Sequence, residues 1–183
     1  DVKVLAIGAH PDDLEYGCAG TLIKHAQRGD EVYMMIVTDG SAGGEADLRE
    51  REQREAAKII GARDVFFGGY PDTQFECHRD SIMKIEEIVR QVEPDTVYTH
   101  FGEDTHQDHR HIARAVVPAA RSVPNLLFFE GYSSQQFLPT VFVDISGVIH
   151  LKLGALEAHA SQVPKTNIQA MTIVDIAQSA ANF

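Results

Sequence analysis

The chain has 183 residues, of which 44% are hydrophobic, and a formal net charge of −11 at pH 7. This length suits one domain, and the hydrophobic content is sufficient for a buried core. The negative charge argues against nucleic acid or an anionic membrane as the main partner, because both are bound through clustered Lys and Arg.

The chain shows no pattern typical of membrane insertion or secretion. No stretch reaches the roughly 18 apolar residues of a membrane helix, and the sequence opens in a strand-like run without a basic and apolar leader. Its two cysteines do not form the framework of a small secreted disulfide protein. We therefore expect a cytoplasmic protein with reduced thiols.

Strand-like and helix-like segments alternate along the chain. Apolar runs of strand length cover residues 2–8, 31–38, 64–67, 95–100, 125–130 and 139–144. Helical patterns cover residues 14–28, 46–60, 80–92, 110–121, 146–159 and 173–183. Glycines follow the first two helices, and Pro118 is expected to kink or end the fourth.

This alternation predicts an α/β fold of Rossmann-like type, with a mostly parallel sheet covered by helices on both faces. No composition break, repeat or low-complexity linker marks a boundary, so we expect residues 1–183 to form one domain. The last predicted helix ends without a capping residue, which is consistent with a domain that lacks its C-terminal end.

Dinucleotide binding, a frequent function of such folds, is not favoured by the first strand–helix turn. The turn reads Gly8-Ala9-His10-Pro11-Asp12-Asp13. Its carboxylates stand where a diphosphate would have to approach backbone amides. Asp39 follows the second strand as a ribose-binding acid would, but the glycine pattern of that motif is missing.

Two short clusters concentrate residues that bind metals and transfer protons. His10-Pro11-Asp12-Asp13 follows the first strand, and His106-Gln107-Asp108-His109 follows the strand at 95–100. The carboxyl ends of parallel strands share one edge of a sheet, so we expect the clusters to converge. A catalytic Zn²⁺ usually takes three His, Asp or Glu ligands and keeps a position open. Candidate ligands are His10, Asp13 and His109.

The remaining residues of the clusters suit proton transfer. Asp12 is the natural general base, and His106 suits the reacting groups. Asp108 could fix the tautomer of a neighbouring imidazole. The alternative is that Asp108 is a helix N-cap and that the histidines line a polar surface. From the residues alone, metal-assisted hydrolysis of an amide or ester is the predicted chemistry, and the metal could also be Fe²⁺ or Co²⁺.

Together these runs resemble the PIG-L/LmbE-like family of zinc-dependent N-acetylglucosaminyl de-N-acetylases. The likeness spans nearly the whole chain and includes residues 17–21, 38–40, 49–57 and 159–162. It implies that His10, Asp13 and His109 hold Zn²⁺. It also implies that Asp12 is the general base and that His106, oriented by Asp108, is the electrostatic catalyst or acid.

The resemblance also implies a substrate and an assembly. The substrate would be a small conjugate of an N-acetyl amino sugar, cleaved to acetate and the free amine, and the protein would assemble into trimers or hexamers. Some relatives have a tyrosine two residues before the first histidine of the second cluster, where this chain has Asp104. A tyrosine-assisted oxyanion site is therefore not assured, although Tyr70 or Tyr132 could reach in from other loops.

Three further residues are candidates for substrate binding. Arg49 could donate hydrogen bonds to sugar hydroxyls, with Glu52 orienting it from one helical turn away. The alternative is an ordinary surface pair in a helix rich in Arg and Glu. Asp39 is either a contact near the substrate or an acid that approaches a helix.

Two other functions stay open at this point. The same residues could hydrolyse another amide or an ester, although the Arg-poor loops do not favour phosphoryl transfer. A catalytically idle module that binds sugar or metal is the other alternative. Asp12 and His106 argue against it, because binding requires neither a base nor an acid.

Overall fold

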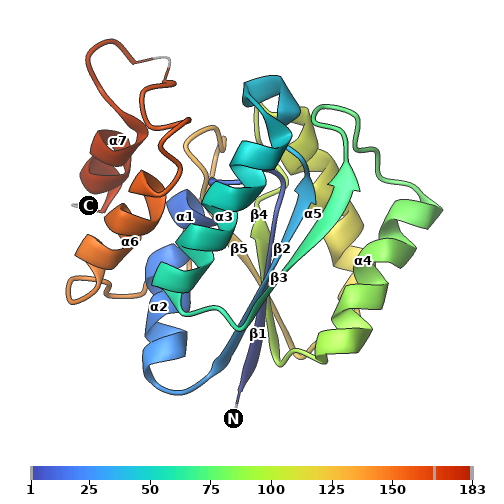
Figure 1. The fold of residues 1–183 in the computed structure, drawn as a ribbon. Coiled ribbons are helices and arrows are strands. Elements are labelled where there is room, and N and C mark those ends of the chain that lie inside the picture. Colours follow the sequence, from blue (N-terminus) through green and yellow to red (C-terminus); the bar gives the residue numbers. More distant parts are fainter. Residues whose placement is uncertain (1, 167, 182–183) are drawn as a thin grey trace.

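A five-stranded parallel sheet forms the centre of the computed structural model, which describes residues 2–166 and 168–181. The strands are β1 (Lys3–Gly8), β2 (Glu31–Thr38), β3 (Asp64–Tyr70), β4 (Thr96–His100) and β5 (Asn125–Phe129). They lie in the order β3-β2-β1-β4-β5, and every neighbouring pair is parallel (Figure 1). The predicted α/β fold is confirmed.

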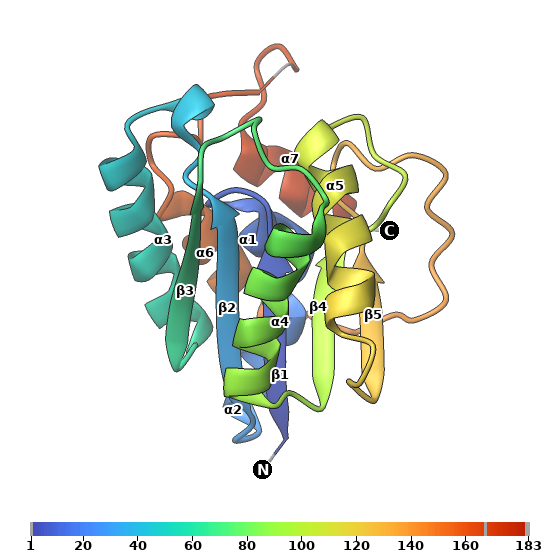
Figure 2. The same cartoon turned by 90° about the vertical axis from the view of Figure 1, so that its right-hand side faces the viewer.

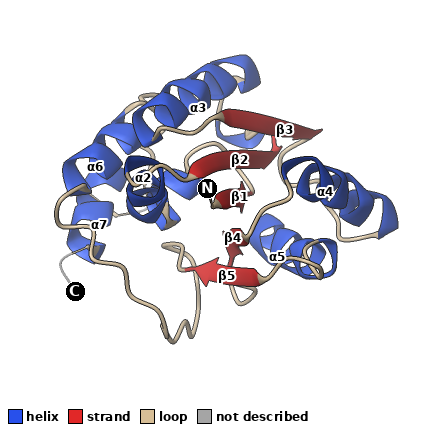
Figure 3. Cartoon of the chain, turned by 90° about the horizontal axis from the view of Figure 1, so that it is seen from below, coloured by secondary structure: helices blue, strands red, loops and turns tan. Residues whose placement is uncertain are grey.

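Helices cover both faces of this sheet. One face carries α1 (Asp13–Gly17), α2 (Ala19–Gln27), α3 (Ala46–Ile60) and α6 (Ile149–Glu157), with α7 (Ile173–Ala180) beside α6. The other face carries α4 (Arg79–Val92) and α5 (Gln107–Ala119), which stand in front of the strands in Figure 2. Seen from below in Figure 3, the sheet separates the two groups of helices.

The central strand explains why two layers of helices are needed. Val4 to Gly8 of β1 are all buried, so successive side chains fill opposite cores. Val4 and Ala6 pack with residues of α2, α3 and α6, whereas Leu5 and Ile7 pack with residues of α4 and α5. Each such aliphatic side chain contributes roughly 1.5–3 kcal/mol when fully buried.

The strand order places the end of β1 at the point where the topology reverses. The chain moves from β1 outward to β2 and β3, then returns to β4 on the other side of β1. In open parallel sheets this switch point leaves a crevice at the carboxyl ends of the strands. The loop after β1 and the loop after β4 meet there.

The helix predicted at 14–28 is divided in the structure. It forms α1 and α2, which are separated at Cys18 with φ of −138° and ψ of 4°. A Cβ at Gly17 would lie 2.2 Å from the ring of Phe129, so the absence of a side chain allows β5 to approach closely. Lys152 Nζ donates to the carbonyl of Tyr16 at 2.6 Å, an acceptor that a continuous helix would use itself.

Two strand predictions also need correction. β3 continues to Tyr70, because Gly68 lets the backbone approach β2 where the register shifts between Ile36 and Thr38. The predicted strand at 139–144 is irregular and pairs with no other described segment. It leaves Phe142 79% exposed, since strand composition alone provides no hydrogen-bonding neighbour.

The predicted helix boundaries change by a few residues. α5 begins at Gln107 rather than 110 and ends one residue after Pro118, and α6 is shorter at both ends than predicted. α7 opens with a capping box between Thr172 and Asp175, while the last two residues of that predicted helix lie outside the described residues. Within residues 2–166 and 168–181, no helix has both the length and the hydrophobicity needed to cross a membrane.

Candidate metal centre

The first cluster lies in the tight turn between β1 and α1. A Cβ at Gly8 would lie 2.9 Å from Leu14 Cγ, so glycine lets the strand end close against the helix. The backbone N–H of His10 donates to Asp13 Oδ2 at 2.7 Å. Asp12 has a φ of 101°, which is costly for a residue with a side chain. The turn thus fixes its three polar side chains in one arrangement.

The three predicted metal ligands converge around the Asp13 carboxylate. His10 Nδ1 lies 3.1 Å from Asp13 Oδ2, and His109 Nε2 lies 3.3 Å from Asp13 Oδ1. The other nitrogen of each ring faces a different carboxylate: His10 Nε2 is 3.0 Å from Asp108 Oδ2, and His109 Nδ1 is 3.2 Å from Asp104 Oδ2. Residues separated by almost 100 positions therefore form one buried cluster.

Mutual ion pairing controls the ionisation of this cluster. Burial favours a neutral Asp13, but the charges of His109, His100 and His10 hold the pKa of Asp13 well below its usual range. Burial likewise opposes an imidazolium at His10, yet Asp13 and Asp108 raise the pKa of His10 well above its usual range. The same competition raises the pKa of His109 to about 9. The surrounding carboxylates therefore favour the protonated form of both histidines.

The donor set fits a divalent metal. Imidazole and carboxylate donors suit Zn²⁺, Fe²⁺ and Co²⁺. His109 Nε2 is buried and has no hydrogen-bond partner among the described residues, although it faces Asp13. Ligand atoms lie within 4.8 Å of one another in three triads: His10, His106 and His109; Asp13, His100 and His109; and His10, Asp72 and Asp108. The two oxygens of Asp13 contact the other two predicted ligands, and each triad contains at least one of the three predicted ligands.

His106 caps α5 and faces the two predicted histidine ligands. Its Nδ1 accepts a hydrogen bond from the backbone N–H of Asp108 at 3.2 Å, so the neutral ring carries its proton on Nε2. Its ring centroid lies 4.6 Å from that of His10 and 4.7 Å from that of His109. Burial and the charges of His10 and His109 lower the pKa of His106. The alternative in which Asp108 is the N-cap is wrong, because His106 occupies that position.

Asp108 contacts a different histidine from the one expected. Its Oδ2 faces His10 Nε2 and accepts a hydrogen bond from the backbone N–H of Thr73 at 2.9 Å. Asp108 therefore meets His106 through its backbone N–H, not through its carboxylate. The side chain is fully buried and orients the ring of His10.

Asp12 stands beside the predicted ligands with one quarter of its side chain exposed. Burial and the charge of Asp13 raise its pKa to about 7, while Arg49, whose Nη2 lies 3.3 Å from Asp12 Oδ2, opposes that rise. Arg49 also donates to the carbonyl oxygens of Gly40 at 2.7 Å and Pro11 at 2.6 Å. The predicted sugar-binding arginine is thus buried, where it ties the Asp12 turn to the loop after β2.

A buried polar network lies behind Asp12. Gln53 Oε1 accepts the backbone N–H of Asp12 at 3.3 Å, and Gln53 Nε2 donates to Glu15 Oε1 at 2.7 Å. Glu15 Oε2 in turn faces His159 Nε2 at 3.5 Å, and all three network side chains are fully buried. Burial opposes a charged His159, but Glu15 and Asp12 outweigh it and raise the pKa of His159.

The two other predicted substrate-binding residues make structural contacts in this conformation. No hydrogen bond or ion pair joins Glu52 to Arg49 in the described part of the chain; the Glu52 carboxylate accepts the N–H and the Oγ–H of Ser161 at 2.8 and 2.7 Å. Asp39 Oδ1 accepts the backbone N–H groups of Ser41 and Asp72 at 2.9 and 3.0 Å. Each acid thereby binds a segment distant in sequence, because Ser161 is 109 positions from Glu52 and Asp72 is 33 positions from Asp39.

Asp72 is a member of the cluster that the sequence analysis missed. Its Oδ1 lies 3.1 Å from His10 Nε2, and its Oδ2 accepts the N–H of Ala42 at 3.1 Å. A signal existed, because Asp72 follows the carboxyl end of β3 just as the two clusters follow β1 and β4. The prediction ended that strand at Phe67 and so left Asp72 inside a loop.

His100, the last residue of β4, is a second buried member of the cluster. The backbone N–H of Ala9 donates to His100 Nε2 at 3.0 Å, and the His100 ring stacks on that of His109 with centroids 4.0 Å apart. Burial and the charge of His109 lower the pKa of His100 to about 4. His100 is therefore a neutral ring that supports His109.

The loop after β5 closes one side of the cluster. Ser133 Oγ lies 3.5 Å from His109 Nδ1, and Ser134 Oγ donates to Asp104 Oδ2 at 3.3 Å. Between β5 and these serines, Tyr132 is 62% exposed, and its ring meets that of Tyr16 with centroids 5.7 Å apart. Burial and the charges of Asp13 and Asp12 raise the pKa of Tyr132, so its ring lies within the field of the cluster.

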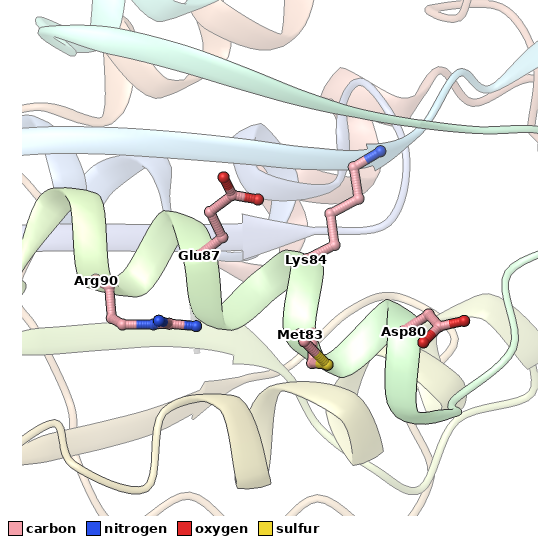
Figure 4. Close-up of a pocket in the computed structure, with 5 residues that line it drawn as sticks. All are labelled: Asp80, Met83, Lys84, Glu87 and Arg90. Atoms are coloured by element: carbon pink, nitrogen blue, oxygen red, sulfur yellow. The ribbon is translucent and has the colours of Figure 1, made fainter.

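Two hollows lie outside the cluster. The larger, of about 570 Å³, follows α4 and is lined by Asp80, Met83, Lys84, Glu87 and Arg90 (Figure 4). The smaller, of about 180 Å³, lies beside Pro11 and is lined further by Thr38, Asp39, Ala46, Asp47, Glu50, Phe67 and Gly69. The hollow on α4 combines charges of both signs from one helix and holds none of the predicted site residues, so we place the chemistry at the cluster.

A parallel α/β sheet with a buried, metal-site-like cluster of His and Asp at its switch point defines the class of protein. The family model described as GlcNAc-PI de-N-acetylase, PIG-L, matches residues 5–120, and the chain belongs to this family.

Several relatives of the chain are named as deacetylases. The uncharacterized deacetylase YaiS of Escherichia coli is 35% identical over 86% of this chain and 90% of the relative. The diacetylchitobiose deacetylase of Thermococcus kodakarensis is 30% identical over 89% of this chain and 71% of the relative. A solved structure of a conserved Thermus thermophilus protein has a TM-score of 0.88 at 26% identity, covering 98% and 86% of the two chains.

One relative carries a different name. The 4-oxalmesaconate hydratase of Pseudomonas putida is 25% identical over 87% of this chain and 74% of the relative. Water addition is therefore represented among similar proteins, and an activity assay must distinguish it from deacetylation.

Proposed function

We propose that the chain is a metal-dependent deacetylase that removes the acetyl group from an N-acetylglucosamine-type amino sugar in a small conjugate. The observation that carries this proposal is the convergence of His10, Asp13 and His109 beside Asp12 and His106. Zn²⁺ is the preferred metal, with Fe²⁺ and Co²⁺ as alternatives. The names of the Thermococcus and Escherichia coli relatives support the reaction.

His10, Asp13 and His109 would hold the metal. When bound, it polarises the acetyl carbonyl and lowers the pKa of a water molecule, which is the chemistry that these side chains cannot provide alone. Asp108 and Asp72 orient His10 from its Nε2 side, and His100 supports the ring of His109. The protein thus supplies a rigid donor set.

Asp12 would accept the proton of the attacking water. Its partial exposure leaves it accessible to water, and a pKa of about 7 makes it a competent base near neutral pH. Arg49 restricts the Asp12 carboxylate through the 3.3 Å contact. The strained backbone of Asp12 keeps this side chain beside, rather than among, the ligands.

His106 would stabilise the developing oxyanion. Because its Nδ1 is engaged by the N–H of Asp108, its Nε2–H is the donor available to substrate. The lowered pKa of His106 favours this neutral form. The proton required by the leaving amine would return from Asp12, which received it from the water.

The test is acetate release from N-acetylglucosamine conjugates, including diacetylchitobiose, by protein stripped of metal and then supplied with Zn²⁺, Fe²⁺ or Co²⁺. We expect metal-dependent release of acetate and amine in equal amounts. Asp12→Asn should keep metal binding and lower turnover by about 10²–10⁴-fold. Asp64→Asn, at the exposed start of β3, is the matched control and should retain activity.

Each other outcome identifies an alternative. Metal binding without acetate release, together with hydration of 4-oxalmesaconate, would support the hydratase chemistry named in the Pseudomonas relative. Release from other amides or esters but not from amino sugars would correct the substrate class. Metal binding with no turnover on either panel would support an idle binding module.

A further inference from the structure

Asp104 contacts the predicted ligand His109 at the ring nitrogen that does not face Asp13. Asp104 Oδ2 lies 3.2 Å from His109 Nδ1, while His109 Nε2 faces Asp13 Oδ1 at 3.3 Å. The side chains of Asp104 and His109 are 0% and 4% exposed. Asp13 and Asp104 therefore hold the two nitrogens of one ring from opposite sides, away from water.

The Asp104 carboxylate is itself fixed by contacts from two loops. Its Oδ1 accepts the backbone N–H of His106 at 2.8 Å, and its Oδ2 accepts the hydroxyl of Ser134 at 3.3 Å. An isolated antiparallel bridge pairs Asp104 with Ser134, and the N–H of Thr105 donates to the carbonyl of Ser133 at 3.1 Å. Asp104 cannot move without disturbing both loops.

This arrangement determines which nitrogen of His109 is available to a metal. A carboxylate facing Nδ1 keeps a proton on that atom, and the lone pair of the neutral ring is then on Nε2. Carboxylates in this position also raise the basicity of a ligating imidazole and hold its orientation. The side chain at 104 therefore acts on the ligand and does not face the substrate as an oxyanion donor.

We infer that Asp104 is a positioning residue that fixes the tautomer and orientation of His109 and thereby strengthens metal binding. The inference rests on the proposed metal centre. It assigns a role to Asp104, which stands where some relatives have a tyrosine. Through Ser134, which donates to Asp104, the loop after β5 would also support the metal centre.

The test is the zinc dissociation constant, measured by competition with a chelating dye on protein stripped of metal. Asp104→Asn is expected to weaken zinc binding by about 10–100-fold. Asp30→Asn is the matched control, because Asp30 Oδ2 faces His25 Nδ1 at 2.7 Å just before β2, at the opposite edge of the sheet. It should leave the zinc dissociation constant unchanged.

A spectroscopic measurement on the unchanged chain tests the inference even if Asp104→Asn fails to fold. In ¹⁵N spectra of the zinc-loaded protein, His109 should show a protonated Nδ1 and a metal-bound Nε2. Zinc affinity of Asp104→Asn within twofold of that of the unchanged chain, or a metal-bound Nδ1, would overturn the inference. Failure of the unchanged chain to bind any divalent metal would instead overturn the proposed function.

Discussion

The backbone N–H of Asp12 donates to the side-chain oxygen of Gln53 at 3.3 Å, although the two residues are 41 positions apart. Asp12 has a positive φ of 101°, a conformation that persists only where its surroundings enforce it. Gln53 is itself oriented by Glu15, to which it donates at 2.7 Å. The backbone conformation of Asp12, the candidate base, is therefore held in part by a side chain of α3.

Gln53→Leu should reduce both stability and turnover. The substitution leaves Oε1 of the buried Glu15 carboxylate without its donor, at a cost of about 1–3 kcal/mol in the free energy of unfolding. It also releases the Asp12 backbone, and we expect kcat to fall about tenfold with little change in KM. Urea unfolding and steady-state kinetics provide the two measurements. Gln91→Leu, on an exposed position of α4, is the control; equal effects of the two substitutions would contradict the role of Gln53.

Asp72→Asn should weaken the metal centre. The amide can still accept the N–H of Ala42, but it removes the negative charge that faces His10 Nε2 at 3.1 Å. We expect the zinc dissociation constant to rise and kcat/KM to fall by about 10–100-fold. Dye competition and acetate release measure these quantities. Values within twofold of those of the unchanged chain would show that Asp108 alone is sufficient to orient His10.

Tyr132 should contribute its ring rather than its hydroxyl. The ring is 62% exposed, rests against Tyr16 and adjoins the cluster, which is a suitable platform for the apolar face of a sugar. Tyr132→Ala is therefore expected to raise KM for an amino sugar about tenfold, whereas Tyr132→Phe should retain the KM of the unchanged chain. If Phe and Ala are equally impaired, the hydroxyl acts on the substrate and the stacking role is wrong.

His159 should make stability depend on pH. Burial opposes its charge, but Glu15 and Asp12 raise its pKa in the folded state above the ordinary value of 6.5. The folded state then binds more protons than the unfolded state above about pH 6.5, so this contribution is complete below that pH and is lost as pH rises through the raised pKa. The unfolding free energies of the unchanged chain and of His159→Gln should therefore converge as pH rises. His150→Gln, on an exposed position, should leave the slope unchanged.

The sheet was predictable because burial on both faces leaves a strong signal in composition. β1 and β2 are almost continuously buried, so their runs of apolar residues identify them without knowledge of their neighbours. Residues 139–144 are also rich in β-branched and aromatic side chains, but a strand needs a neighbour to accept its hydrogen bonds, and that neighbour is not encoded locally. The break at Cys18 likewise depends on Phe129 and Lys152, which lie far along the chain.

The candidate site residues were predicted from their positions after strands, and the differences between the predicted and observed contacts follow from the limits of that rule. His10, Asp13 and His109 do converge, whereas Asp72 was missed because β3 was drawn too short. Glu52 was paired with Arg49 by helical spacing, but its hydrogen-bond partner Ser161 is 109 residues away. Local patterns locate the donors of such a site, but not the long-range contacts that orient them.

The raised pKa values of His10 and His109 have a consequence for metal binding at the proposed centre. The carboxylates around these rings outweigh the effect of burial and favour the protonated form of each ring. A divalent cation at the proposed centre would need the same lone pairs, so we expect metal binding to release protons and to weaken as pH falls. Protons and metal would thus compete for one set of nitrogens flanked by carboxylates.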